Sequence, residues 1–113
     1  MKHSTGTPNV AERAHMDRIK DRGVCVCCRQ RGYRYKQLVE IHHLLSGGKR
    51  RGHLLTVGLC QWHHRGIPPF GWGDAEALYE LGPSLAKGSK PFRAVFGSDD
   101  DLLAAQERAW RDE

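Results

Sequence analysis

The sequence of 113 residues lacks a long apolar run. No stretch approaches the roughly 20 apolar residues that a helix needs to cross a bilayer, which excludes a membrane-spanning protein. The first ten residues also lack the apolar centre of a signal peptide, so we expect a cytoplasmic protein. Hydrophobic residues make up only 39% of the chain, which suffices for one small domain.

Acidic residues are nearly missing from the middle of the chain. Residues 25–65 contain eight Lys/Arg and a single acid, Glu40, giving +7, whereas residues 1–24 carry +2 and residues 66–113 carry −4. A run of charge often forms only a solvated face. Its coincidence with the cysteines and most histidines favours binding of a polyanion such as DNA.

The sequence also lacks any sign that its cysteines form disulfides. Disulfides persist in oxidising compartments, and no segment directs export. All four cysteines and five of the seven histidines lie within residues 25–65. In a reducing compartment, cysteines with nearby histidines are typical of a metal site.

Two pairs of potential ligands have the spacing of a zinc knuckle. Cys25-x2-Cys28 and Cys60-x2-His63 each supply two ligands, and together they complete the tetrahedral shell of one structural Zn²⁺. Thiolate and imidazole suit zinc better than hard cations such as Mg²⁺. Cys27 is an alternative to Cys28 or a spare buried thiol, and the x2 spacing favours Cys28.

Local patterns predict an α+β chain. We expect an N-terminal basic segment over residues 1–22, partly disordered or helical, with Thr7 as the helix cap and Pro8 in the first turn. Residues 23–113 are expected to form the main domain. Its predicted strands are 38–43 and 54–59. Its predicted helices are 61–65, 74–81, 89–96 and one capped by Ser98 and Asp101. Basic loops are expected over 29–37 and 46–52. The last helix carries an apolar stripe expected to face the core, formed by Leu102, Ala105, Ala109 and Trp110.

Within residues 25–65, four histidines remain outside the predicted zinc shell. His42 and His43 are neighbours on a predicted strand, so their side chains face opposite ways and we expect them to have different roles. His63 and His64 are neighbours on a predicted helix and diverge by about 100°. His64 can therefore face the strands while His63 binds zinc. His53 lies between the two strands.

These motifs together resemble the HNH endonucleases. The matching residues are Cys25-x2-Cys28, Glu40-Ile-His-His43, the Gly47-Gly48 loop and Gly58-Leu-Cys-x2-His-His64. The resemblance implies a small zinc-knuckle ββα-metal (HNH/His-Me finger) core with flanking helices. It also implies that His42 and His64 bind a catalytic divalent metal and that His43 is the general base.

One residue of the HNH pattern has no clear counterpart. The middle Asn is absent, and His53 is the nearest polar side chain. His53 could orient the base, contact the phosphate or complete the metal shell, and a loop histidine with none of these roles is the alternative.

A narrower resemblance, to the phage-derived recombination-enhancement nucleases of the Ref type, rests on residues 41–53, 56–66 and 82–92. It implies DNA cleavage directed by a RecA filament in a bacterial or phage-infected cell. The expected catalytic metal is Mg²⁺ or Mn²⁺, with Zn²⁺ or Ni²⁺ able to occupy the same site. The DNA backbone is expected to contact Lys49, Arg50, Arg51 and Arg65. The alternatives are a non-catalytic zinc-stabilised module that binds DNA or protein, and an HNH nuclease that acts without RecA.

Overall fold

The computed structural model describes residues 6–46 and 49–112, with the backbone alone at residues 46, 49 and 50. Within these ranges the chain has an α+β fold, and none of its helices is long and apolar enough to span a membrane. The elements in chain order are α1 (Val10–Arg22), α2 (Val26–Gln30), β1 (Glu40–His43), β2 (Leu45–Ser46), β3 (Lys49–Arg50), β4 (Thr56–Leu59), α3 (Gln61–Arg65), α4 (Asp74–Leu81), the 3-10 helix η1 (Leu85–Lys87), α5 (Ser89–Phe96) and α6 (Asp99–Arg111).

The centre of the fold is the antiparallel pair of β1 and β4. Glu40 pairs with Leu59 at one end, and His43 pairs with Thr56 at the other. Both strands are shorter than the sequence predicted, because residues 38 and 39 and residues 54 and 55 lie outside the ladder. Part of the expected basic loop 46–52 instead forms strand β3, which pairs with β2, while Gly47 and Gly48 lie outside the described residues.

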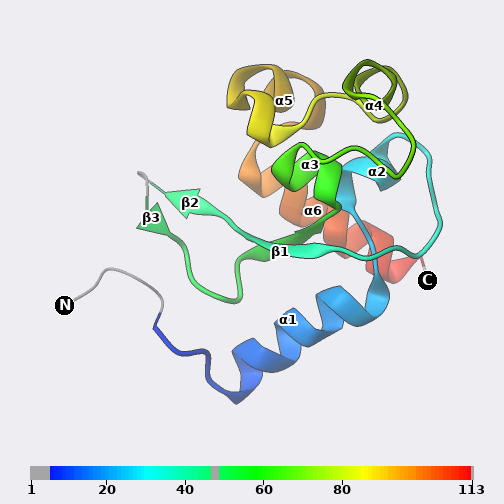
Figure 1. Cartoon of the computed structure of the whole chain (residues 1–113). Helices are drawn as coiled ribbons and strands as arrows, with labels where there is room; N and C mark the ends of the chain where they lie inside the picture. The colour runs from blue at the N-terminus through cyan, green and yellow to red at the C-terminus, as the bar shows by residue number, and fades with distance from the viewer. Residues whose placement is uncertain (1–5, 47–48, 113) are drawn as a thin grey trace.

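Helices cover the two sides of this strand pair. Helix α1 lies below β1 in Figure 1, and α3, α4 and α5 lie above it with α6 behind. The core between them includes Ile19 from α1, Val57 and Leu59 from β4 and Leu102 from α6, each at most 1% exposed. The expected inward stripe on α6 is confirmed, since Ala105 and Ala109 are buried as well.

Strand β4 is held from the side by α6. The side-chain amide of Gln106 donates to the carbonyl oxygen of Thr56 at 3.0 Å and accepts from the backbone N–H of Gly58 at 3.0 Å. One side chain therefore satisfies two backbone groups that β1 leaves unpaired. A Cβ at Gly58 would lie 2.6 Å from the carbonyl oxygen of Val24 and 2.9 Å from Ile19, so only glycine fits here.

The helix ends partly match the sequence prediction. Helix α1 begins after Asn9, whose side chain accepts from the N–H of Glu12 in a capping box, so the predicted cap at Thr7 is wrong. A side chain three residues before a helix N–H is well placed to cap it, and Asn is as good a cap as Ser. The predicted capping box of Ser98 and Asp101 is confirmed at the start of α6.

Candidate functional site

Four metal-binding side chains meet where the first turns of α2 and α3 come together. Cys25 is the N-cap of α2 and Cys28 lies in its first turn, while Cys60 is the N-cap of α3 and His63 lies within it. All four are buried, and their ligand atoms lie within 4.8 Å of one another. The structure thus brings together the four residues predicted from the x2 spacing.

The distances within this cluster fit a tetrahedral zinc shell. Zinc–sulfur bonds of about 2.3 Å and zinc–nitrogen bonds of about 2.0 Å place sulfurs about 3.8 Å apart and sulfur about 3.5 Å from nitrogen. The Sγ atoms of Cys28 and Cys60 are 3.8 Å apart. Nδ1 of His63 lies 3.5, 3.6 and 3.3 Å from the sulfurs of Cys25, Cys28 and Cys60. The group therefore has the geometry of a structural zinc site.

The pKa shifts within the cluster favour a thiolate at Cys25 and a neutral thiol at Cys28. Burial works against a thiolate at Cys25, but hydrogen bonds from its neighbours lower its pKa well below the usual thiol value. The Nε2–H of His63 donates to the carbonyl oxygen of Leu81 at 2.6 Å, because a carbonyl can only accept. Burial lowers the pKa of His63, but hydrogen bonds and charge from Cys25 and Cys60 outweigh it and raise the pKa to about 10. Nδ1, which faces the sulfurs, offers its lone pair to a metal ion once that proton has left.

Cys27 has a different environment although it is equally buried. Burial first, and the nearby Cys25 second, raise the pKa of the Cys27 thiol. Hydrogen bonds to Cys25 and Cys60, together with burial, raise the pKa of Cys28 as well, so the position of the sulfur and not its pKa distinguishes the two residues. Cys27 is not among the four clustered ligands, and all four cysteines are free thiols. The structure thus selects Cys28 for the cluster and leaves Cys27 as a buried thiol.

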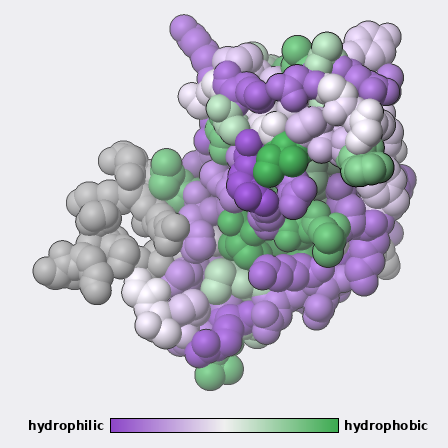
Figure 2. Space-filling model, viewed as in Figure 1, coloured by the Kyte–Doolittle hydropathy of each residue, from purple (hydrophilic) through white to green (hydrophobic). Residues whose placement is uncertain are grey.

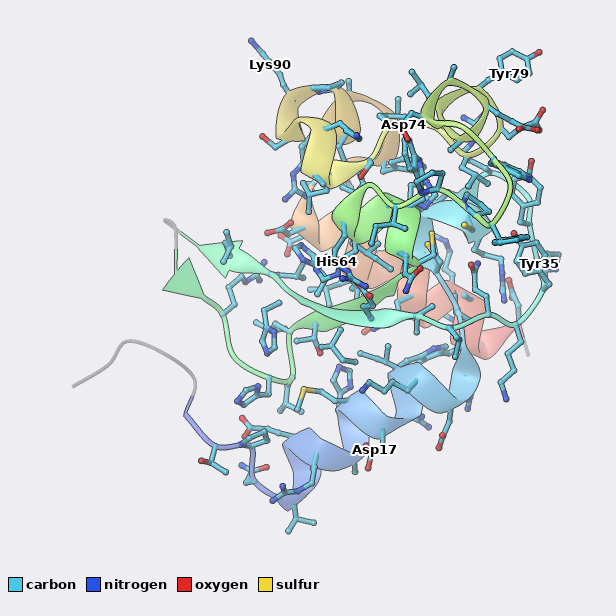
Figure 3. The ribbon with its side chains drawn as sticks, in the orientation of Figure 1. Asp17, Tyr35, His64, Asp74, Tyr79 and Lys90 are labelled. Atoms are coloured by element: carbon cyan, nitrogen blue, oxygen red, sulfur yellow. The ribbon has the colours of Figure 1, made fainter. Side chains whose placement is uncertain are left out.

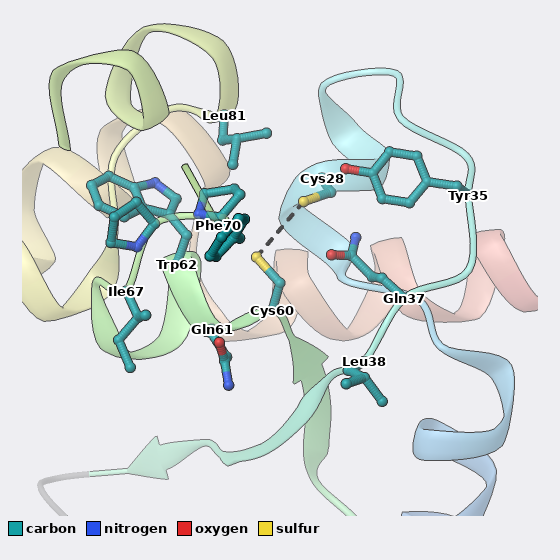
Figure 4. A pocket seen from close by; sticks show the side chains of 12 residues that line it. Cys28, Tyr35, Gln37, Leu38, Cys60, Gln61, Trp62, Ile67, Phe70 and Leu81 are labelled. Carbon is teal, nitrogen blue, oxygen red and sulfur yellow. Dashed lines mark hydrogen bonds between the residues drawn. The ribbon is translucent and has the colours of Figure 1, made fainter. Parts of the chain in front are cut away.

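An apolar pocket of about 280 Å³ opens beside the cluster (Figure 4). Leu38, Ile67 and Phe70 lie on its walls, and the three are 90%, 42% and 104% exposed. Figure 2 shows an apolar area in the middle of an otherwise mainly hydrophilic face. The described residues that line the pocket include neither histidine nor carboxylate, so the histidines outside the cluster do not face it.

The first pair of histidines outside the cluster joins β1 to α3. The rings of His42 and His64 are 5.3 Å apart between centroids and inclined to each other by 67°, and Figure 3 shows His64 between α3 and β1. Burial, followed by the charge of His64, lowers the pKa of His42 to about 4. His42 is therefore neutral at physiological pH, the form in which an imidazole binds a metal.

Glu40 fixes the second of these rings. Its Oε1 accepts from Nδ1 of His64 at 2.7 Å and from Nε of Arg65 at 2.9 Å, and its Oε2 accepts from the Arg65 guanidinium at 2.5 Å. The Arg65 bonds, with a smaller contribution from His64, hold the pKa of Glu40 below its usual value. In the neutral form of His64, Nε2 is then the nitrogen with a lone pair, and the arrangement is typical of a metal-binding histidine with a carboxylate behind it.

The second pair of histidines lies on the other side of β1. Nε2 of His43 is 3.0 Å from Nδ1 of His53, and Nε2 of His53 is 2.8 Å from the carbonyl oxygen of Gly6. His53 is only 5% exposed. The expected separation of His42 from His43 is thus present, with each paired to a different partner.

The predicted basic residues have mixed surroundings. Arg51 pairs with Asp100 at 3.1 Å, and Arg65 pairs with Glu40. The side chains of Lys49 and Arg50 lie outside the described part of the chain. Close to His42, the charges of Asp99 and Arg93 act on its pKa in opposite directions, and these two residues form an ion pair at 2.6 Å.

Three of these residues were missed by the sequence analysis. Glu40 was noted only as part of a motif, although it is the single acid among residues 25–65, which could have singled it out. Arg93 and Asp99 lie in the acidic third of the chain, which the sequence treats as separate from the histidines. No local signal connects them, because α5 and the start of α6 reach the site only through the tertiary fold.

One comparison with known proteins identifies relatives. The model of a protein family described as "Recombination enhancement, RecA-dependent nuclease" matches residues 8–110 of the chain. No curated protein sequence matches it. The matched range includes every residue of the metal cluster and both histidine pairs.

Proposed function

The chain belongs to the family of recombination-enhancement, RecA-dependent nucleases, and from this premise we propose that it is an HNH-type endonuclease that hydrolyses DNA phosphodiester bonds at its two histidine pairs. The family implies a DNA substrate and the involvement of RecA. The observation that carries the proposal is the pairing of His42 with His64 outside the zinc cluster. A module held together by zinc alone would not need these imidazoles.

The local architecture supports this reaction class. Strands β1 and β4 followed at once by α3 form a ββα unit, with His42 and His43 on the first strand and His64 on the helix. This is the arrangement expected of a ββα-metal core. The zinc cluster at the start of α3 anchors the helix, and thereby fixes His64 relative to β1.

His42 and His64 have the chemistry to hold a catalytic divalent cation. His42 is neutral, and the bond from His64 Nδ1 to Glu40 leaves Nε2 with a lone pair. Two protein ligands leave most positions of the ion to water and phosphate, which suits Mg²⁺ or Mn²⁺. When bound, such an ion supplies positive charge for the negative charge that develops on the phosphoryl and leaving oxygens.

His43 is the proposed general base. An imidazole can accept a proton at physiological pH, and His43 lies next to His42 on the strand that would carry the metal ligand. In the reaction an O–H proton of water passes to His43, and the electron pair of that bond forms the new P–O bond. The bond to the 3′ oxygen breaks, and that oxygen keeps its electrons and takes a proton from solvent.

His53 supports His43 in this scheme. Of the three roles open to it from the sequence, its hydrogen bond to His43 favours orientation of the base. The DNA backbone would lie along Lys49, Arg50 and Arg51, which follow β1 in the chain and give affinity without sequence preference. Arg65 is held by Glu40 and is better placed to fix that carboxylate than to reach DNA alone.

The proposal is tested by removing the base. His43→Ala should retain one zinc and the wild-type circular dichroism spectrum while nicking of RecA-paired plasmid falls by about 10² to 10⁴, the contribution typical of general base catalysis. His15→Ala, which removes an imidazole from α1, is the matched control and should cleave normally. Cleavage by His43→Ala at the control rate would overturn the assignment.

A further inference from the structure

His53 connects the N-terminal segment to the proposed base. One ring nitrogen lies 2.8 Å from the carbonyl oxygen of Gly6, and the other lies 3.0 Å from Nε2 of His43. The backbone of His53 is itself fixed, because the hydroxyl of Thr56 donates to its carbonyl oxygen at 2.8 Å. Gly6 and His43, which are 37 positions apart, are thus joined through one buried imidazole.

The carbonyl oxygen of Gly6, at the end of this series of hydrogen bonds, determines which ring nitrogen of each histidine carries the hydrogen. A carbonyl oxygen only accepts, so Nε2 of His53 must be the donor to Gly6. A neutral imidazole carries a single N–H, and Nδ1 of His53 is therefore an acceptor. The atom facing it, Nε2 of His43, must then donate. This leaves the lone pair of His43 on Nδ1.

We infer that the carbonyl group of Gly6, acting through His53, selects the tautomer of His43 in which Nε2 carries the hydrogen. Gly6 and His53 are therefore positioning groups, and the segment before α1 is part of the active site. The statement that His43 is the base rests on the proposed function. The hydrogen bonds that join Gly6, His53 and His43, and the tautomers they select, do not depend on the proposed function.

The same physical rule holds at the other two sites in the fold. His63 donates to the carbonyl oxygen of Leu81, which leaves Nδ1 for the cysteines, and His64 donates to Glu40, which leaves Nε2. In each case a fixed acceptor on one side of the ring sets the function of the other side. His43 differs because its acceptor is another histidine, whose own state depends on Gly6.

A side chain can be added at Gly6 without a steric clash. Its φ of +66° lies in the left-handed region, and a Cβ there would meet nothing within 4 Å. Proline fixes φ near −65°, so Gly6→Pro must reorient the carbonyl group. Gly71 has φ +87° and equally open surroundings, which makes Gly71→Pro the matched control.

The test is a long-range ¹H–¹⁵N correlation spectrum of the imidazole rings in the full-length, zinc-loaded protein without added divalent cation. At neutral to mildly alkaline pH, this experiment distinguishes a ring nitrogen that carries hydrogen from one that carries a lone pair. The wild-type protein and Gly71→Pro should show His43 and His53 each protonated at Nε2. Gly6→Pro should show a mixture of tautomers at His43, and its cleavage rate should fall about tenfold, a fraction of the effect of losing a general base.

Two variants of His53 separate positioning from simple structural support. His53→Gln keeps an acceptor for His43 and a donor for Gly6, and should retain the wild-type tautomer of His43. His53→Leu keeps the bulk of the side chain but removes both the acceptor for His43 and the donor for Gly6. This variant should lose the wild-type tautomer of His43 while retaining zinc. The inference is overturned if His43 carries its proton at Nδ1 in the wild-type protein, or if Gly6→Pro and His53→Leu leave its tautomer unchanged. If the tautomers behave as inferred but His43→Ala still cleaves DNA, the proposed function fails and the tautomer assignment stands.

Discussion

Oε1 of Glu40 accepts a hydrogen bond from Nδ1 of His64 at 2.7 Å, across the junction between β1 and α3. The same carboxylate binds Arg65, the next residue on the helix, through both of its oxygens. A single acid therefore joins the strand to the helix and fixes the tautomer of the proposed metal ligand. The orientation of the proposed metal ligand His64 therefore depends on the packing of β1 against α3.

Loss of the Glu40 charge should weaken binding of a divalent cation at the proposed site formed by His42 and His64. We expect Glu40→Gln to lower affinity for Mn²⁺ about 10- to 100-fold, the range typical of partners that orient a metal-binding histidine. Zinc content should not change, because Glu40 does not contact the cysteine cluster. Calorimetric titration of zinc-loaded protein measures this, with the exposed Glu76→Gln on α4 as control. Equal Mn²⁺ affinity in both variants would contradict the role given to Glu40.

The cysteines should separate cleanly into ligands and a spare thiol. Cys28→Ser should lose most of its zinc and the cooperative unfolding transition, since binding of a structural zinc contributes on the order of 10 kcal/mol in small domains. Cys27→Ala should keep one zinc and lose about 1 kcal/mol from the small void it leaves. Elemental analysis and thermal denaturation measure both effects. Retention of zinc by Cys28→Ser and its loss by Cys27→Ala would reverse the assignment.

The four residues of the Cys25, Cys28, Cys60 and His63 cluster were predicted in full because their spacing is local. Two residues separated by two others fall within one turn at the start of a helix, so the sequence alone places Cys25 near Cys28 and Cys60 near His63. The separation of His42 from His43 was predictable for the same reason, since it follows from strand geometry.

The partners of these side chains were not predictable. Glu40 meets His64 only because β1 lies against α3, and His53 meets Gly6 only because the segment before α1 passes the end of the strands. The capping error at Thr7 has a local cause, because Asn9 is an equally good cap and has Glu12 three residues further on.

Acid should destabilise the protein partly through His42. The unfolded residue takes up a proton near pH 6.5, whereas in the fold burial lowers the pKa to about 4. Between these values the unfolded state binds more protons, so stability falls as the pH is lowered through this window, by about 2 kcal/mol from this residue at about pH 5.

His42→Gln should therefore lose less stability than wild type on acidification. Urea denaturation of zinc-loaded protein near neutral pH and near pH 5 measures the difference between the two proteins. Parallel losses of stability in the two proteins would show that His42 is not held neutral by the fold.

The basic segment after β1 should set the salt dependence of DNA binding. Each phosphate contact contributes about 0.9 to the slope of log affinity against log salt, so removal of three charges should reduce the slope by up to about 2.7. The triple alanine variant of Lys49, Arg50 and Arg51 is compared with a triple variant of the exposed Lys20, Lys90 and Arg111. Fluorescence anisotropy with a DNA duplex at several salt concentrations measures the slopes. A larger reduction in the second variant would place the DNA elsewhere.

Cleavage of plasmid DNA with a RecA filament tests the central claim most directly. The substrate is supercoiled plasmid with Mg²⁺ or Mn²⁺, and a RecA filament is assembled either on an oligonucleotide that matches one plasmid site or on one that matches none. The account predicts cleavage at the matched site only with the filament and the divalent cation, and a rate about 10² to 10⁴ times lower for His43→Ala under the same conditions. Cleavage by His43→Ala at the wild-type rate, or the absence of any cleavage by the wild-type protein with matched filament and cation, would contradict it.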